Sequence, residues 1–173
     1  MNKLTFFIFF ISLSVAGQSI EFEKIEKTDS LVKKEVLFNR LSSKLIELVG
    51  GQAKYEKSVI QSDKELGIIK FRQELNYVKS GRSDNGIVKY VVSVFIKDGK
   101  FKIILNDFVH EGMGISLSTI TQDEEYPHEQ KSWLKFRKRA WKELKTYINA
   151  EIPIEILIIE KILITPTELE KEW

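Results

Sequence analysis

Two histidines are the residues of this chain whose type and neighbours suggest metal chemistry. His110 and His128 are each followed by glutamate, as in the zinc-binding pattern His-Glu-x-x-His, which places two imidazoles on one helix face. The fifth position of that pattern is Gly114 after the first histidine and Ser132 after the second. Neither stretch is therefore a zinc-protease motif.

A zinc site would need both histidines and acids from the segment between them, because such sites take three or four ligands. The available acids are Asp123, Glu124 and Glu125. The segment also offers hydroxyl nucleophiles, with His128 as base and Asp123 to orient it, at Ser116, Ser118 and Thr119. It holds no Gly-x-Ser-x-Gly turn. We favour the interpretation that these histidines, acids and hydroxyl residues are solvent-exposed loop side chains without a catalytic role. The alternative is a small hydrolase or metal-dependent enzyme with its site in residues 110–128.

Two short glycine-containing motifs have structural interpretations. Residues 112–114 read Gly-Met-Gly, lack the third glycine of a dinucleotide loop and lead into Ser/Thr rather than a helix. Residues 84–86 read Asp-Asn-Gly without the alternating acids of a calcium loop, which is typical of a turn. The sequence therefore assigns no catalytic, cofactor-binding or metal-binding residue, and no cofactor.

One charge asymmetry stands out on an expected helix. The helix expected over about residues 129–149 has a cluster of seven basic residues with Glu143 as the acid among them. The basic residues are Lys131, Lys135, Arg137, Lys138, Arg139, Lys142 and Lys145. Such a cluster can contact phosphate, an anionic membrane or an acidic polysaccharide. We favour a solvated face whose long stems lie over apolar neighbours.

The N-terminus has the pattern of a secretory signal peptide. Lys3 precedes an apolar run at residues 4–15, and small residues allow cleavage after Ala16 or, as we favour, between Gly17 and Gln18. The run is shorter than the roughly 20 residues of a bilayer span. We expect a periplasmic or secreted protein that is not an integral membrane protein after cleavage.

The composition limits the remaining classes of protein. Cysteine is absent, which removes disulfides, thiolate chemistry and the acceptor of a lipoprotein anchor. A net charge of +2 argues against bulk attraction to nucleic acid, so no nucleic-acid partner is expected. A mature chain of about 156 residues is long enough for one self-supporting core. We assign residues 1–17 to the signal, 18–150 to one domain and 151–173 to a C-terminal extension.

Hydrophobic periodicity predicts a first strand near residues 20–25, then a helix over about residues 31–49. Thr28, Asp29 and Ser30 are its candidate N-caps, and Gly50-Gly51 ends it. Residues 55–110 resemble a strand meander, with candidate strands at 55–60 and 66–78. The hairpin over residues 87–108, which turns at Asp98-Gly99, is the strongest pattern.

A second amphipathic helix is expected over about residues 129–149, with Trp133 and Trp141 on its apolar stripe. Residues 111–127 are expected to form a mobile loop. Ile-rich residues 152–164 fit both a strand and a helix, and their β-branched side chains favour a strand. Such a segment must pack on the domain or meet a partner, because an uncovered one would aggregate.

Three stretches resemble a family of exported bacterial proteins of unknown function with a TATA-binding-protein-like fold: residues 36–40, 65–71 and 90–107, including Lys97-Asp98-Gly99-Lys100-Phe101. The likeness covers about residues 29–149, and Lys44 stands where family members often carry Trp. The resemblance implies an α+β fold: a curved antiparallel sheet of about five strands with two helices on one face. It implies no activity.

The face of that sheet opposite the helices is the expected contact surface. If Tyr90, Val92 and Val94 face the helices, alternation places on the open face Lys89, Val91, Ser93, Phe95, Lys100, Lys102, Ile104 and Asn106. The leading hypothesis is an exported, non-catalytic binding module that meets a protein or envelope partner through this face or the C-terminal tail. A carrier of apolar ligands is a further alternative, since a cavity between helix and sheet would hold one.

Overall fold

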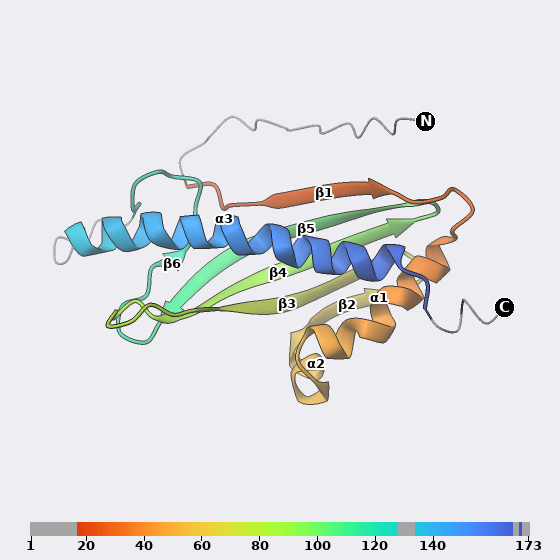
Figure 1. The fold of residues 1–173 in the computed structure, drawn as a ribbon, viewed down its shortest axis with the longest axis horizontal. Coiled ribbons are helices and arrows are strands. Elements are labelled where there is room, and N and C mark those ends of the chain that lie inside the picture. The colour runs from red at the N-terminus through yellow and green to blue at the C-terminus, as the bar shows by residue number, and fades with distance from the viewer. Residues whose placement is uncertain (1–16, 128–133, 168–169, 171–173) are drawn as a thin grey trace.

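The chain folds into an antiparallel sheet with helices on one face, as a computed structural model shows for residues 17–127, 134–167 and 170 (Figure 1). The elements are β1 (Phe22–Lys27), α1 (Lys34–Leu48), α2 (Gln52–Ser58), β2 (Val59–Asp63), β3 (Ile68–Tyr77), β4 (Gly86–Lys97), β5 (Lys100–Gly112), β6 (Ser118–Thr119) and α3 (Leu134–Ile164). The strand order is β1-β5-β4-β3-β2, and β6 also pairs with β5. The expected α+β architecture is confirmed, with α2 as an additional short helix.

The β4–β5 hairpin forms where the alternation predicted it. Its two strands pair antiparallel from Lys97 opposite Lys100 to Gly86 opposite Gly112, and Asp98-Gly99 makes the turn. Gly99 has φ of 67°, a conformation that side chains disfavour. A register shift between Lys89 and Val91 marks a bulge, which bends a sheet locally.

Helix α1 begins differently from the prediction. The expected caps Thr28, Asp29 and Ser30 precede the helix, whose N-cap residue Lys33 makes no side-chain cap bond. The carboxylate of Asp98 in the hairpin turn instead accepts the Lys34 N–H at 2.7 Å. Tertiary contact thus supplies the acceptor that a local cap usually provides. The predicted helix end is confirmed, with Gly50 and Gly51 at positive φ.

The expected strand over residues 55–60 starts too early. The Tyr55 N–H donates to the Gly51 carbonyl at 3.0 Å, so this stretch first makes the helical turns of α2. Strand β2 begins only at Val59 and pairs with β3. Alternation in a short segment cannot distinguish these two structures.

The Ile-rich tail is helical, so the expected strand is wrong. Helix α3 runs from Leu134 across residues 150 and 151 to Ile164 and contains Pro153. Ile152, Ile159 and Leu163 are buried at helical spacing against the sheet and α1. Packing of this stripe outweighs β-propensity. The prediction that the tail packs on the domain is confirmed.

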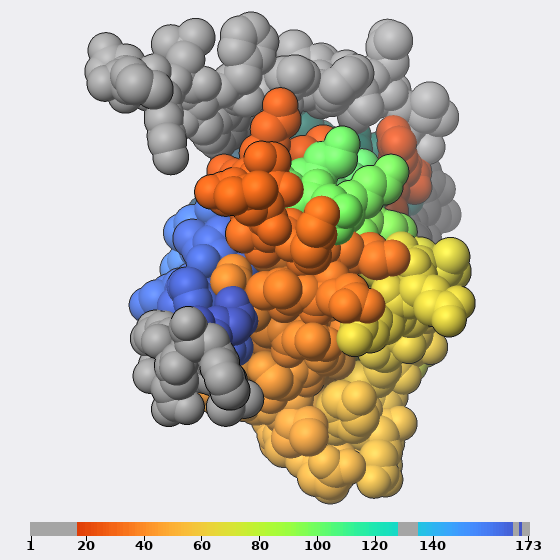
Figure 2. Space-filling view, turned by 90° about the vertical axis from the view of Figure 1, so that its right-hand side faces the viewer, coloured from red at the N-terminus to blue at the C-terminus, as the bar shows by residue number. Residues whose placement is uncertain are grey.

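The core lies between the sheet and helices α1 and α3, which cover the same face (Figure 1). Its largest fully buried side chains include Trp141, Phe71, Phe101, Leu41 and Leu105. At one end of the molecule, the β4–β5 turn meets the β1–α1 connection and the β2–β3 turn, coloured green, orange and yellow in Figure 2. This end and the opposite sheet face are not covered by helices α1 and α3.

Candidate binding surface on the open face of the sheet

His110 is buried, and both of its ring nitrogens have partners. Nδ1 accepts the Leu117 N–H at 3.1 Å, which leaves Nε2 to donate to the Asp84 carbonyl at 2.9 Å. Burial lowers the pKa of His110, although the Asp84 hydrogen bond opposes the shift. Neutral His110 therefore joins β5 to the residues before β6 and to the β3–β4 connection.

The enzyme hypothesis also involved residues that the structure places elsewhere or does not describe. His128 and Glu129 lie outside the described residues. Asp123 accepts a hydrogen bond from the Thr121 hydroxyl at 2.7 Å, and Ser116 bonds with Gly112. Within residues 17–127, 134–167 and 170, no three His, Asp or Glu side chains converge as a metal site would require.

Residues 111–127, expected to form a mobile loop, are anchored to the domain by buried apolar side chains, with exposed residues such as Met113 between them. Leu117 and Ile120 are fully buried, and Tyr126 is nearly so. Ser118 and Thr119 form β6 against β5. The Trp141 indole N–H donates to the Asp123 carbonyl at 3.0 Å, which ties the segment to α3. The Gly- and Ser-rich composition concealed these few apolar anchors.

The basic residues of α3 hold this same segment. Lys138 pairs with Glu125 at 2.8 Å, and Lys145 donates to the carbonyls of Gln122 and Asp123. Arg137 donates to the Tyr126 hydroxyl at 2.9 Å. Hydrogen bonding to Lys138 lowers the pKa of Glu125. Much of the basic cluster is therefore partnered within the molecule. Lys131 lies outside the described residues.

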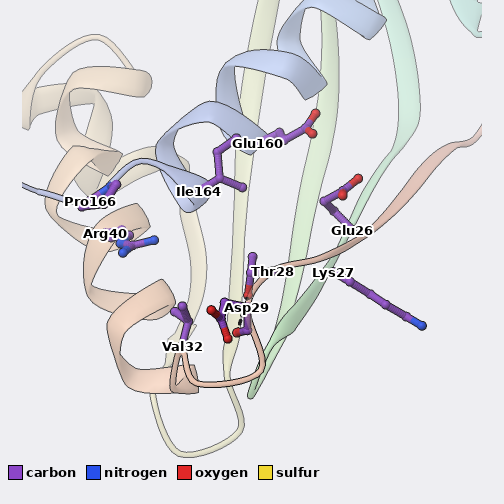
Figure 3. Close-up of a pocket in the computed structure, with 9 residues that line it drawn as sticks. All are labelled: Glu26, Lys27, Thr28, Asp29, Val32, Arg40, Glu160, Ile164 and Pro166. Atoms are coloured by element: carbon purple, nitrogen blue, oxygen red, sulfur yellow. Dashed lines mark hydrogen bonds between the residues drawn. The ribbon is translucent and has the colours of Figure 1, made fainter. Parts of the chain in front are cut away.

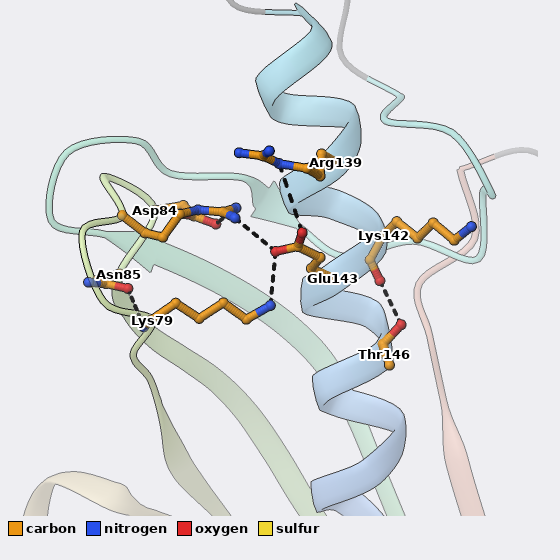
Figure 4. Close-up of polar contacts among 8 residues, drawn as sticks. Lys79, Asp84, Asn85, Arg139, Lys142, Glu143 and Thr146 are labelled. Atoms are coloured by element: carbon orange, nitrogen blue, oxygen red, sulfur yellow. Dashed lines mark hydrogen bonds and ion pairs between the residues drawn. The ribbon is translucent and has the colours of Figure 1, made fainter.

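A polar cluster joins the β3–β4 connection to α3 (Figure 4). Arg82 donates to both oxygens of the fully buried Asp84 at 2.8 and 2.9 Å, and to Glu143 at 2.9 Å. Lys79 also donates to Glu143 at 2.9 Å, and this bond is the main cause of the lowered pKa of Glu143. The predicted turn at residues 84–86 was correct, but the sequence did not indicate that its aspartate is a buried anchor. The cluster is structural, because its charges satisfy one another.

A cavity of about 550 Å³ lies beside the C-terminal end of α3 (Figure 3). It is lined by Glu26, Lys27, Thr28, Asp29, Val32, Arg40, Glu160, Ile164 and Pro166. Arg40 is occupied by Glu170, whose pKa it lowers to about 2, and by the Leu163 carbonyl. Glu160 pairs with Lys24 at 2.5 Å. The lining combines charged and apolar residues, and two of its charges are paired with residues outside it, unlike the mostly apolar pocket of a lipid carrier.

The open face of the sheet holds the eight residues predicted for it. The neighbours that alternate with them, such as Val92, Val94 and Ile103, are fully buried under the helices. On the open side, Phe95 is 38% exposed and Ser93 is shielded by the side chains around it. Lys89 pairs with Glu111 and Lys102 with Glu23, both at 2.6 Å. The predicted surface therefore exists as one face.

A row of three lysines crosses this face at its hairpin end. Lys100 lies directly opposite Lys27 of β1 and directly opposite Lys97 of β4. All three are exposed, and no ion pair joins any of them to another described residue. Like charges directly opposite one another destabilise a sheet. The sequence could not reveal this row, because it depends on the register of β1 against β5.

An apolar hollow lies next to the lysine row. Its volume is about 360 Å³, and it is lined by Ile25, Phe95, Lys97, Lys100, Phe101 and Lys102. Ile25 is 59% exposed. Directly opposed residues place Ile25, Lys102 and Phe95 in the row adjacent to the lysines. Apolar contact area and unpaired positive charge therefore occur together.

An antiparallel sheet with two long helices on one face and an open second face defines the class of fold. No protein-family model matches the chain, and no curated protein does. Solved structures do match: a TBP-like protein from Parabacteroides distasonis ATCC 8503 has a TM-score of 0.56 at 12% identity, over 89% of this chain and 98% of that chain.

A DUF4468 family protein from Bacteroides ovatus ATCC 8483 also has a TM-score of 0.56, at 15% identity, over 90% of this chain and 92% of the other. The chain thus has the TATA-binding-protein-like fold of these bacterial proteins, which confirms the fold expected from the resemblance. Identities this low concern the fold, and fold alone does not determine function. No helix within the described ranges has the length and apolarity to cross a membrane.

Proposed function

We propose that this protein is an exported, non-catalytic binding module that meets a protein or envelope partner through the open face of its sheet. The lysine row of Lys27, Lys100 and Lys97 beside exposed Phe95 carries the proposal. Such a row costs stability unless something anionic covers it, and exposed aromatic side chains are enriched where proteins bind partners. The partner surface would therefore be anionic with an apolar element.

The proposed destination is the periplasm or the medium. It rests on the signal pattern of residues 1–17, of which residues 1–16 lie outside the described part. Every described helix and strand follows Gly17, so cleavage there would leave the fold complete. We propose one domain starting at Gln18; residues 151–164, assigned to a C-terminal extension from the sequence, continue α3 and contribute to its core. Intact mass of the purified protein should show Gln18 as the first residue, and Phe9→Arg should block processing because it interrupts the apolar run.

The alternative surface for this role is the outer side of α3 in the C-terminal tail. Ile154, Leu157, Ile158 and Ile164 are each 42–56% exposed there. This is the part of the C-terminal tail that does not pack on the domain. Residues on α3 therefore serve as the matched control for the open face, since both surfaces expose large apolar side chains.

The test is affinity capture of the C-terminally tagged protein from its own cell envelope. We expect a specific partner with the unaltered protein and with Leu157→Glu, and its loss with Phe95→Glu. Truncation at Asn149 is unsuitable, since it removes the buried Ile152, Ile159 and Leu163. Capture of no specific partner, or loss only with Leu157→Glu, would count against the open face.

A further inference from the structure

Three turns are tied into one unit at the hairpin end of the molecule, which faces the viewer in Figure 2. The Gly99 N–H donates to the Val32 carbonyl, and the Thr28 N–H to the Gly99 carbonyl, both at 2.9 Å. The Ile96 N–H donates to the Gly67 carbonyl at 2.7 Å. The β1–α1 connection and the β2–β3 turn are therefore held on either side of the β4–β5 turn.

Two of these turns carry a leucine that faces solvent. Leu31 is 81% exposed and Leu66 is 64% exposed. An aspartate fixes each of them in the same way: Asp29 accepts the Leu31 N–H at 2.9 Å, and Asp63 accepts the Leu66 N–H at 2.8 Å. These hydrogen bonds from leucine N–H groups to aspartate carboxylates fix the two turns on which the exposed leucines lie.

Five exposed lysines lie on or directly beside these three turns. Lys27, Lys97 and Lys100 form the unpaired row, while Lys33 and Lys64 make only long, exposed contacts of 4.0 and 3.9 Å with acids. Exposed pairs of this kind contribute little. The aspartates of the three turns are short and bind backbone N–H groups, including Asp98 on Lys34. Glu35 and Glu65 are also exposed at this end, so the positive charge available to a partner comes mainly from the three lysines of the row, which no described acid pairs.

We propose that this end docks on an anionic phospholipid surface, with Leu31 and Leu66 entering the interface and the lysines meeting the headgroups. A flat surface can touch three adjacent turns at once, and neither leucine lines the cavity or the hollow described above. Apolar side chains at the interface and basic residues near anionic lipid are the two contributions that hold peripheral proteins. Lipid docking and partner binding share the lysine row, but only lipid docking uses Leu31 and Leu66, which lie on the turns outside the open sheet face. Replacing the two leucines should therefore weaken lipid binding and leave partner capture through Phe95 unchanged.

The test is co-sedimentation with vesicles of phosphatidylglycerol and phosphatidylcholine, against vesicles of phosphatidylcholine alone. The chain from Gln18 to Trp173 is used, because it holds every described element and lacks the apolar run that would itself enter lipid. We expect binding to the anionic vesicles and at least about tenfold weaker partitioning for Leu31→Ser with Leu66→Ser. Lys97→Gln and Lys100→Gln should each weaken it about fivefold.

Leu157→Ser and Lys142→Gln on α3 are the matched controls and should leave partitioning within about twofold. Leu31→Trp should bind the anionic vesicles more tightly, and its tryptophan fluorescence should shift to shorter wavelength on binding. A gain in binding cannot result from a folding defect, so this variant keeps the test independent of one. Equal binding to neutral vesicles, no effect of the leucine pair, or loss with the α3 variants instead would overturn the proposal. Binding to soluble polyglutamate but not to anionic vesicles would also overturn it, in favour of an acidic polymer.

Discussion

Replacing Lys100 by glutamate should stabilise the protein although it alters the candidate binding surface. Lys100 lies directly opposite Lys27 and Lys97, so Lys100→Glu turns two repulsive neighbours into two attractive ones. Cross-strand pairs are worth roughly 0.2–1 kcal/mol each. Two such changes among exposed side chains give a gain of about 1 kcal/mol in the free energy of unfolding.

Thermal and urea unfolding measure this gain. A change of about 1 kcal/mol raises Tm by roughly 2–4 °C for a chain of this size. The gain should shrink near 1 M salt, where the screening length is about 3 Å. The matched control is Lys102→Gln, which removes the 2.6 Å pair with Glu23 and should not stabilise. A Lys100→Glu variant that is destabilised, or a gain that is insensitive to salt, would refute the like-charge argument.

Three further predictions concern the elements that support this surface. Ile159→Ala should cost about 2–5 kcal/mol and Ile158→Ala under about 1 by urea unfolding, because only the former is buried; similar costs would contradict the helical phase of the tail. Burial lowers the pKa of His110, so stability should fall as pH drops below about 6.5, where the unfolded state takes up a proton. His110→Gln should lose that part of the pH dependence, and an unchanged profile would argue against burial of a neutral ring. Asp84→Asn should cost about 3 kcal/mol, since it leaves Arg82 without its buried partner, whereas half-exposed Glu143→Gln should cost under about 1.

The hairpin could be predicted from sequence because its signals are local. Strict alternation from Val88 to Ile96 and a two-residue turn at Asp98-Gly99 determine both the pairing and the buried face. The same alternation correctly placed Phe95 and Lys102 on the open face. Both results depend only on residues that are close in the chain.

The tail and the candidate site depend on contacts between distant residues. Ile154, Ile156 and Ile158 alternate like a strand, and only the core available to Ile152, Ile159 and Leu163 decides for a helix. The lysine row likewise requires β1 to pair with β5, which brings together residues 27 and 100. Asp98 as the acceptor for α1 is a third long-range contact. Local patterns allow the helix in the tail but do not choose it, and they do not indicate the other two contacts.

Site-specific photo-crosslinking in the protein's own cells tests the proposed binding surface most directly. Phe95→benzoylphenylalanine places the probe on the open face, while the same substitution at Leu157 and at exposed Asn39 provides controls on α3 and α1. We expect a specific adduct from position 95, and its loss when Lys97 and Lys100 are also replaced by glutamate. An adduct from position 157 alone, or none from position 95, would contradict the open face as the binding surface.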